Sequence, residues 1–205
     1  MKKVKFIVFI CLFILLPLAY FNGFIRISDL TSEQESIAKK YGGVYVFDEK
    51  LEKEIDKREE ERRIMTKGLS GKKLAKNRYA VDMTPVNEKL PRVLSNGKRY
   101  YSRKDNVKID NYKILNNYEE KLKEFMGKDY DKYENYLSIN LGYFYIDNDT
   151  IIPISIGVST LYTEVTFGLY GDEASGIKFT KESTQRLIGD NKFYLSNNKF
   201  QKINK

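Results

Sequence analysis

Apolar residues recur at every second position in three stretches of the second half of the chain, which is the spacing of β-strands with one buried face. The alternating positions form three runs: Leu137, Ile139, Leu141, Tyr143 and Tyr145, then Ile152, Ile154, Ile156 and Val158, then Leu161, Thr163, Val165, Phe167 and Leu169. Turn-forming residues separate the runs at 147–149 and near Ser159. The pattern predicts an antiparallel β-meander over residues 136–170.

Helical spacing and helix-capping residues mark several segments outside the meander. Thr31 with Gln34 three positions later forms a capping-box pattern, and Asn117 can cap a helix with an apolar stripe of Tyr118, Leu122, Phe125 and Met126. The predicted elements are helices over 31–42, 49–64, 117–126 and 180–188, a strand over 44–47, and hairpins over 93–101 and 193–200. We therefore expect an α+β fold, with the meander and a few short helices.

The N-terminal segment lacks periodicity because it is apolar on every side. Its apolar run covers residues 6–21 and extends to 25 if Asn22 and Gly23 are tolerated, and lysines precede it at positions 2, 3 and 5. Twenty helical residues span about 30 Å, the thickness of the hydrocarbon layer of a bilayer. The run predicts a transmembrane signal-anchor over residues 6–25, and the lysines place residues 1–5 in the cytoplasm and the bulk of the chain outside it.

A cleaved secretory signal peptide is the alternative for the same run, because signal peptides also combine a basic start with an apolar core. Signal peptidase requires small residues one and three positions before the cut. Cleavage after Ala19 places Pro17 at the second of these positions, and cleavage after Gly23 places Phe21 there. The sequence thus favours an uncleaved anchor in a cell (inner) membrane, with a secreted soluble binding domain as the alternative. The Met-Lys-Lys start and the abundant Lys, Asn, Ile and Tyr favour a bacterial source.

Composition excludes several kinds of chemistry. The 205 residues include no histidine and no tryptophan, and Cys11 is the only cysteine. Serine–histidine catalysis, cysteine–histidine catalysis and zinc binding need an imidazole or several thiolates, and a disulfide within the chain needs a second cysteine. Residues 147–149 resemble the start of a calcium loop, but Ile151, Ile152 and Val158 occupy positions that require a ligand or a glycine. We expect no metal and no cofactor.

Glu164 is the residue that invites a catalytic interpretation. It interrupts a mostly neutral strand and shares a face with three residues, Tyr162, Thr166 and Tyr170. Two carboxylates can divide acid and base work in the hydrolysis of a sugar bond, and three acidic residues could supply the second one: Asp147, Asp149 and Glu173. A carboxylate-dependent hydrolase acting on cell-wall polysaccharide is therefore an alternative function. The simpler interpretation is a solvent-facing strand residue, and we assign no catalytic residue.

Positive charge is concentrated in the middle of the chain. Residues 64–113 carry thirteen basic and four acidic side chains, and the whole chain has a formal net charge of +8. We expect the preceding segment, 26–65, to be a charged helical spacer and residues 66–205 to be an α+β extracytoplasmic domain.

The basic segment favours binding over catalysis. Tyrosine and arginine are enriched at protein interfaces, so the predicted partner contacts are Arg99, Tyr100, Tyr101 and Arg103. An anionic envelope surface is a second target, solvation without any partner is the neutral alternative, and a location outside the cytoplasm disfavours nucleic acid. The sequence predicts a membrane-anchored protein-interaction module, either an immunity or exclusion factor or an accessory subunit of an envelope assembly.

Overall fold

The computed structural model describes residues 2–21, 23, 25–75, 78–105, 107–109, 113–114, 117–171 and 176–203. Within these residues the helices are α1 (Lys2–Ile10), the π-helix η1 (Cys11–Leu15), α2 (Leu16–Phe21), α3 (Ser32–Tyr41), α4 (Glu49–Lys67), α5 (Thr84–Lys89), α6 (Asn117–Met126), α7 (Lys128–Tyr133) and the 3-10 helix η3 (Glu134–Tyr136). The strands are β1 (Ile25–Ser28), β2 (Gly43–Val46), β3 (Lys72–Ala75), β4 (Arg78–Ala80), β5 (Tyr100–Ser102), β6 (Lys113–Ile114), β7 (Leu137–Leu141), β8 (Tyr143–Asp147), β9 (Thr150–Pro153), β10 (Ser155–Tyr170), β11 (Lys178–Ile188), β12 (Asn191–Ser196) and β13 (Lys199–Lys202). The fold class is α+β, as predicted, but the two larger sheets are mixed rather than purely antiparallel.

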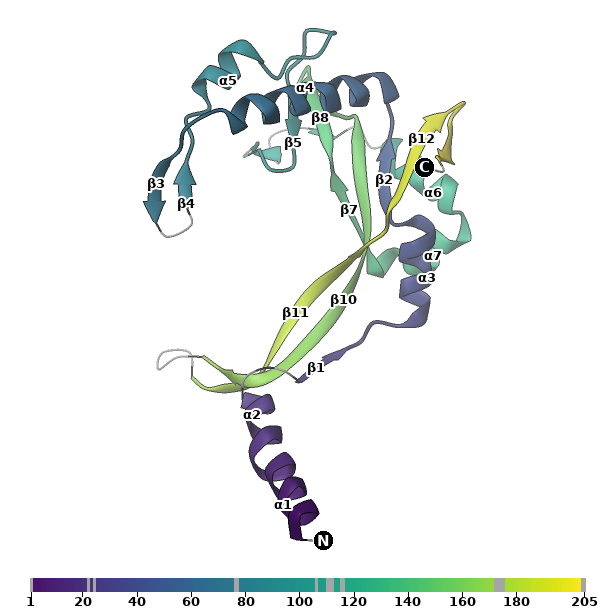
Figure 1. Ribbon diagram of the computed structural model, residues 1–205. Coiled ribbons are helices and arrows are strands. Elements are labelled where there is room, and N and C mark those ends of the chain that lie inside the picture. The colour runs from purple at the N-terminus through teal and green to yellow at the C-terminus, as the bar shows by residue number, and fades with distance from the viewer. Residues whose placement is uncertain are drawn as a thin grey trace.

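The 16-residue strand β10 organises the largest sheet. Near its start β10 pairs with β2 on one side and β7 on the other, and farther along it pairs with β1 and with the long strand β11. Beyond β2 the sheet continues with β12, which runs parallel to β2, and then with β13. Figure 1 shows that the first part of β10 lies in the body of the molecule, whereas the rest forms an arm with β11 that reaches toward the N-terminal helices.

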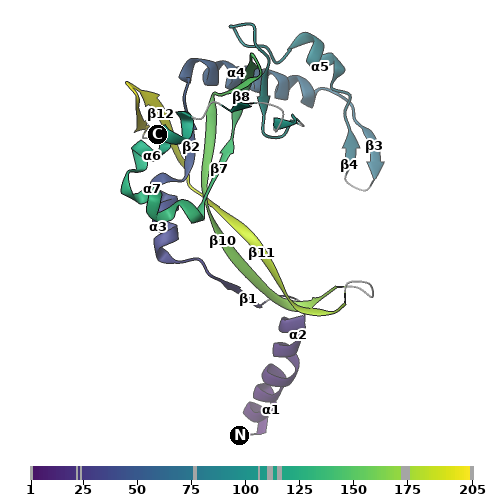
Figure 2. The same cartoon turned by 180° about the vertical axis from the view of Figure 1, so that it is seen from behind.

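Two smaller sheets complete the strand arrangement. One has the order β5-β8-β9-β6, in which β6 runs parallel to β9. The other is the antiparallel pair of β3 and β4. In Figures 1 and 2 α4 crosses the end of the body, and the β3–β4 pair extends from the far side of α4 and α5. The body, the arm and the β3–β4 pair therefore surround a concave side of the molecule.

The meander expected over residues 136–170 is partly right. Asn148 and Asp149 form the turn between β8 and β9 with φ angles of 46° and 57°, a left-handed conformation that asparagine and aspartate tolerate. The turn expected near Ser159 is wrong, because β10 runs through this residue without interruption. Ser159 is buried, and its Oγ donates to the Ser138 carbonyl oxygen at 3.5 Å. Ser159, a polar residue typical of turns, therefore lies inside a long strand, where its buried hydroxyl is hydrogen-bonded.

The helix expected over residues 180–188 is wrong as well. These residues belong to β11, which pairs antiparallel with β10 from Ser159 opposite Ile188 to Tyr170 opposite Lys178. Side chains from Ser183 onward alternate between half-buried and exposed. A strand with polar residues on both faces lacks the alternating apolar pattern that identifies strands in a sequence. Its extended conformation depends on backbone pairing with β10.

The other helices follow their local sequence signals. The capping box of α3 is confirmed: Thr31 Oγ1 accepts from the Gln34 N–H at 3.1 Å, and Gln34 Oε1 accepts from the Thr31 N–H at 2.7 Å. α4 starts at the predicted residue and continues to Lys67. In α6 the predicted apolar stripe faces the core, with Leu122 fully buried.

Most of the segment 26–65 packs into the folded body instead of forming a solvated spacer, while its first residues, in β1, pair with the arm. Tyr45 of β2 and Ile55 of α4 are fully buried. α4 also buries two charged side chains, Glu52 and Arg62, each 5% exposed. Both have partners, an ion pair with Lys192 for Glu52 and hydrogen bonds to the α5 segment for Arg62, which makes their burial tolerable. Although most residues of α4 are charged, one face of this helix packs against the body.

Aromatic side chains dominate the core next to α6. The Tyr45 ring stacks on Phe193 with centroids 4.5 Å apart, and it meets Phe200 and Phe125 edge-on at 4.9 Å and 5.9 Å. These rings come from β2, β12, β13 and α6, so residues distant in sequence stabilise the parallel pairing of β12 with β2. A second cluster beneath α4 contains Ile55, Leu94, Tyr100 and Ile154.

Three glycines allow the chain to cross itself where β11 leads into β12. A Cβ on Gly189 would lie 2.3 Å from both the Ala38 and the Gly42 carbonyl oxygens, and a Cβ on Gly42 would lie 2.4 Å from the Ala38 carbonyl oxygen. Gly43 has a φ of 145°, and a Cβ there would lie 2.0 Å from the Asn191 carbonyl oxygen. Asn191 fastens the crossing, since its Nδ2 donates to the Gly42 carbonyl at 2.7 Å. The arm and the body meet at a junction that has no room for a larger residue.

The N-terminal helices α1, η1 and α2 follow one another directly from Lys2 to Phe21 and project from the end of the arm that lies away from the body (Figure 1). Among the described residues no helix combines the length and the apolar character needed to cross a membrane. This finding does not support the single transmembrane helix expected over residues 6–25. Asn22 and Phe24, which belong to that expected span, lie outside the described residues.

Candidate functional site

A cavity of about 670 Å³ lies between α4 and the sheet. Strands β2, β7 and β10 form its floor, where Gly157 has no side chain and an added Cβ would meet no atom within 4 Å. α4 forms one wall, the residues that follow β5 form another, and the end of β11 forms a third. Pockets of roughly 300–1,000 Å³ hold small ligands, so the cavity is large enough to be a binding site.

The acidic side chains on the α4 wall are all paired with cations. Lys192 Nζ lies 2.5 Å from Glu52 Oε1 and 3.8 Å from Asp56 Oδ2, and Arg92 Nε lies 2.9 Å from Glu59 Oε1. Burial opposes the charge of Lys192, but hydrogen bonds to Glu52 and Tyr194 outweigh it, so the pKa of Lys192 lies above its ordinary value. Two cations thus offset three carboxylates, and most of the negative charge of the α4 wall is compensated.

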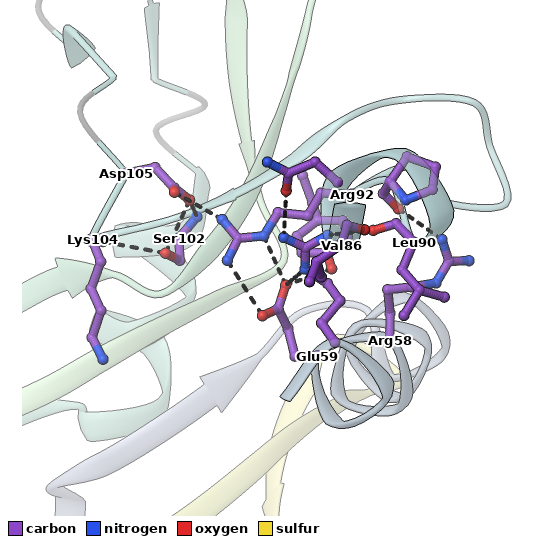
Figure 3. Close-up of polar contacts among 12 residues, drawn as sticks. Arg58, Glu59, Val86, Leu90, Arg92, Ser102, Lys104 and Asp105 are labelled. Atoms are coloured by element: carbon purple, nitrogen blue, oxygen red, sulfur yellow. Dashed lines mark hydrogen bonds and ion pairs between the residues drawn. The ribbon is translucent and has the colours of Figure 1, made fainter. Parts of the chain in front are cut away.

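Arg92 joins the α4 wall to the wall formed by the residues that follow β5, as Figure 3 shows. Its guanidinium donates to Glu59 on α4, and its Nη1 also donates to Asp105 Oδ1 at 2.8 Å. Asp105 in turn holds a tight turn, because its Oδ2 accepts from the Ser102 N–H at 2.7 Å and from Ser102 Oγ at 3.0 Å. Burial raises the pKa of Asp105, but the hydrogen bond from the Ser102 N–H and the charge of Arg92 together lower it by more. The pKa of Asp105 therefore lies below its usual value. The carboxylate thus stays ionised at neutral pH and keeps the turn ordered.

A second set of arginine contacts fixes α4 to the segment around α5. Arg62 donates to Asn87 Oδ1 at 2.7 Å and to the Leu90 carbonyl, and Arg58 donates to the Pro91 carbonyl at 2.8 Å. Planar guanidinium groups with several donors suit such multiple contacts. These contacts hold α4, one wall of the cavity, to the segment around α5.

Three basic side chains on the cavity lack a compensating charge within the described part of the chain. Arg103 and Lys104 occupy the middle of the turn that Asp105 holds, and Arg186 stands on the opposite wall, in β11. All three are exposed, and none forms an ion pair with another described residue. The cavity lining contains five basic and three acidic side chains, a formal net charge of +2 (five minus three), so these three side chains give the cavity mouth a positive potential, which attracts anionic groups.

The structure separates the four predicted contact residues. Arg103 lies on the cavity, and Arg99 is exposed with its guanidinium 5.4 Å from the centroid of the Tyr101 ring. Tyr101 stacks on Phe144 with centroids 5.6 Å apart. Tyr100 was wrongly expected to contact a partner: it is 2% exposed, and its hydroxyl donates to Glu59 Oε1 at 2.7 Å. Successive residues of a strand point to opposite faces, so Tyr100 and Tyr101 cannot share one contact surface.

Glu164 lies in the arm and does not line this cavity. Its Oε1 is 3.7 Å from the Arg26 guanidinium, and its strand neighbours are Ser28 and Ser183. Asp147, one proposed carboxylate partner, belongs to β8 and pairs with Lys98 at 2.6 Å. Asp149 is in the β8–β9 turn, and Glu173 lies outside the described residues. The structure therefore brings none of the described candidate carboxylates to Glu164.

Several residues of the cavity were missed by the sequence analysis. Lys104 directly follows Arg103 in the basic segment, so the charge pattern could have included it. Arg186 gave no signal, because its segment was assigned to a helix and its position depends on pairing with β10. Arg92 and Glu59 are 33 residues apart, and nothing local indicates that they meet.

Neither metal chemistry nor similarity to other proteins assigns an activity to this site. In the described ranges no three His, Cys, Asp or Glu side chains are grouped so that they could hold a metal ion. A scan against protein-family models, a search of curated proteins and a search of solved structures each found no match for this chain.

Proposed function

We propose that this chain is a membrane-anchored, extracytoplasmic binding protein whose cavity accepts an acidic segment of a partner protein. The observation that carries the proposal is the charge arrangement of the cavity: the acids of α4 are paired, while Arg103, Lys104 and Arg186 are left without counter-charge among the described residues. Such a module suits an immunity or exclusion factor or an accessory subunit of an envelope assembly.

The N-terminal helices support the anchoring part of the proposal. Ten large apolar side chains between residues 4 and 16 are exposed, among them Val4 at 64% and Phe13 at 67%. Contiguous apolar surface of this kind is rare in soluble monomeric proteins and requires a cover. Lipid is the cover that fits a stretch apolar on all sides, and the preceding lysines favour a cytoplasmic N-terminus. A cleaved N-terminal segment would leave the same cavity on a secreted domain.

Order at the cavity mouth supports the binding part of the proposal. Asp105 and Arg92 hold the turn that presents Arg103 and Lys104, so these cations need little rearrangement to meet a ligand. Preorganised groups lose less conformational entropy on binding. Exposed cations also attract an acidic partner over a distance, an effect that salt weakens.

Reversing both charges of the turn should release the partner. In the Arg103→Glu/Lys104→Glu variant, like charges meet an acidic segment, and we expect partner recovery to fall by about tenfold or more. The full-length wild type and the variant would be captured in parallel from detergent-solubilised membranes, and co-purified proteins would be quantified by mass spectrometry.

The matched control is Lys199→Glu/Lys202→Glu, which makes the same charge change on exposed residues of β13, away from the cavity. A protein recovered by the wild type and the control, lost by the cavity variant and eluted by salt would support the proposal. Equal recovery by all three proteins, or recovery indifferent to salt, would refute it.

A further inference from the structure

We infer that the tip of the β10–β11 arm rests on the membrane surface beside the apolar N-terminal helices and forms a second lipid contact. The inference rests on the proposed membrane anchoring and adds a surface to it. It concerns residues 169–171 and 176–181, which flank the end of the arm.

The base of the N-terminal helices meets the arm at this tip. The Tyr20 ring of α2 lies 5.9 Å from the Phe167 ring of β10, centroid to centroid. Gly23, just beyond α2, lies so close to the arm that a Cβ on it would be 3.0 Å from the Tyr170 hydroxyl. Figures 1 and 2 both show α2 joining the arm where β10 and β11 end. If the helices enter the bilayer, the tip is therefore level with its surface.

The tip exposes apolar side chains that lack a cover from the described chain. Leu169 is 54% exposed, Ile177 is 68% exposed and Phe179 is 56% exposed. Leu169 lies near the end of β10, Ile177 directly precedes β11 and Phe179 lies at its start, in contrast to the single exposed apolar residues elsewhere, such as Ile64 on α4. Apolar and aromatic side chains at the edge of a membrane-bound protein bury themselves between lipid headgroups.

Basic residues accompany the apolar ones. Lys181 lies two positions after Phe179 on the same face of β11, Lys178 lies between Ile177 and Phe179 on the opposite face, and both lysines are exposed. Neither forms an ion pair with another described residue. Lysines next to apolar side chains are typical of surfaces that bind anionic lipid headgroups. Both this composition and the continuity with the N-terminal helices point to lipid, and not to a second protein, as the occupant.

A second lipid contact at the tip would fix the orientation of the arm relative to the membrane. One flexible attachment would allow the arm to tilt freely, whereas a helix and a strand tip held at the same surface fix its angle. The cavity would then face a constant direction at a constant height above the bilayer.

Tryptophan substitution tests this directly, because the chain contains no tryptophan and each variant carries a single indole. Full-length Phe179→Trp, Phe13→Trp and Ile64→Trp variants would be reconstituted into phosphatidylcholine–phosphatidylglycerol vesicles with or without brominated acyl chains. Bromine quenches indoles that lie in the bilayer. We expect at least about twofold quenching and a blue-shifted emission for F13W and F179W, and neither for I64W, at the opposite end of the molecule.

Each result is decisive for one statement. Quenching of F13W without quenching of F179W would overturn the membrane contact of the tip and leave the anchor intact. Absence of quenching in both would show that the proposed anchoring itself fails. Weaker F179W quenching after Lys178→Glu/Lys181→Glu, seen with phosphatidylglycerol and not with phosphatidylcholine alone, would identify the anionic headgroup as the ligand of the lysines.

Discussion

Replacing Leu12, Phe13 and Ile14 together with aspartate is expected to move the protein from the membrane fraction to the soluble fraction. All three side chains are exposed in η1, at the centre of the N-terminal helical stretch. An aspartate at the centre of an inserted helix costs about 2.5–3.5 kcal/mol on insertion scales. Three such costs exceed about 7 kcal/mol, roughly a 100,000-fold change in partitioning. High-speed sedimentation followed by carbonate extraction measures the outcome.

The control for this change keeps the segment apolar. Leu12→Ile/Phe13→Leu/Ile14→Val alters the same positions without adding charge, and it should remain in the membrane pellet. If the triple aspartate variant resists carbonate extraction as well as the control does, insertion of these residues into lipid is ruled out.

The second large effect concerns the junction between the arm and the body. Gly189→Ala would place a Cβ 2.3 Å from two backbone carbonyl oxygens, those of Ala38 and Gly42. Backbone atoms in a hydrogen-bonded crossing cannot move aside as a flexible side chain can, so the cost lies near the upper end of overpacking, about 3 kcal/mol. Urea unfolding of the detergent-solubilised protein, followed by circular dichroism, measures the free energy of unfolding.

Gly157→Ala is the matched comparison for the junction. Gly157 lies in β10, and a Cβ built there meets no atom within 4 Å. We expect its free energy of unfolding to stay within about 0.5 kcal/mol of the wild type. If the two alanine variants unfold at the same urea concentration, the close crossing does not exist as described.

The elements that the sequence predicted correctly are those with local causes. The Thr31–Gln34 capping box, the apolar stripe of α6 and the Asn148–Asp149 turn depend on neighbouring residues and carry their signal within a few positions. β11 has no such signal, because its polar residues become a strand only when β10 is beside them. Ser159 resembled a turn for the same reason, since its burial depends on distant chain segments.

The residues of the candidate site also divide into those that local sequence indicates and those that depend on distant segments. Arg103 stood out by its charge and its neighbours, and it does lie on the cavity. The alternation of strand residues could have indicated that Tyr100 and Tyr101 face opposite ways, but not which one is buried. The pairing of Arg92 with Glu59 and the position of Arg186 depend on the tertiary fold. Local patterns therefore identified a basic segment but not the acidic wall of α4, whose side chains are paired with Lys192 and Arg92.

Thiol labelling in spheroplasts tests the central claim, that the N-terminus is inside and the folded body outside. Cys11 is the only cysteine, so a Cys11→Ser background carrying either Ser70→Cys or Lys5→Cys has one reporter thiol at an exposed position. The account predicts that a membrane-impermeant maleimide labels S70C in intact spheroplasts and labels K5C only after lysis. Labelling of S70C only after lysis, or of K5C in intact spheroplasts, would contradict it.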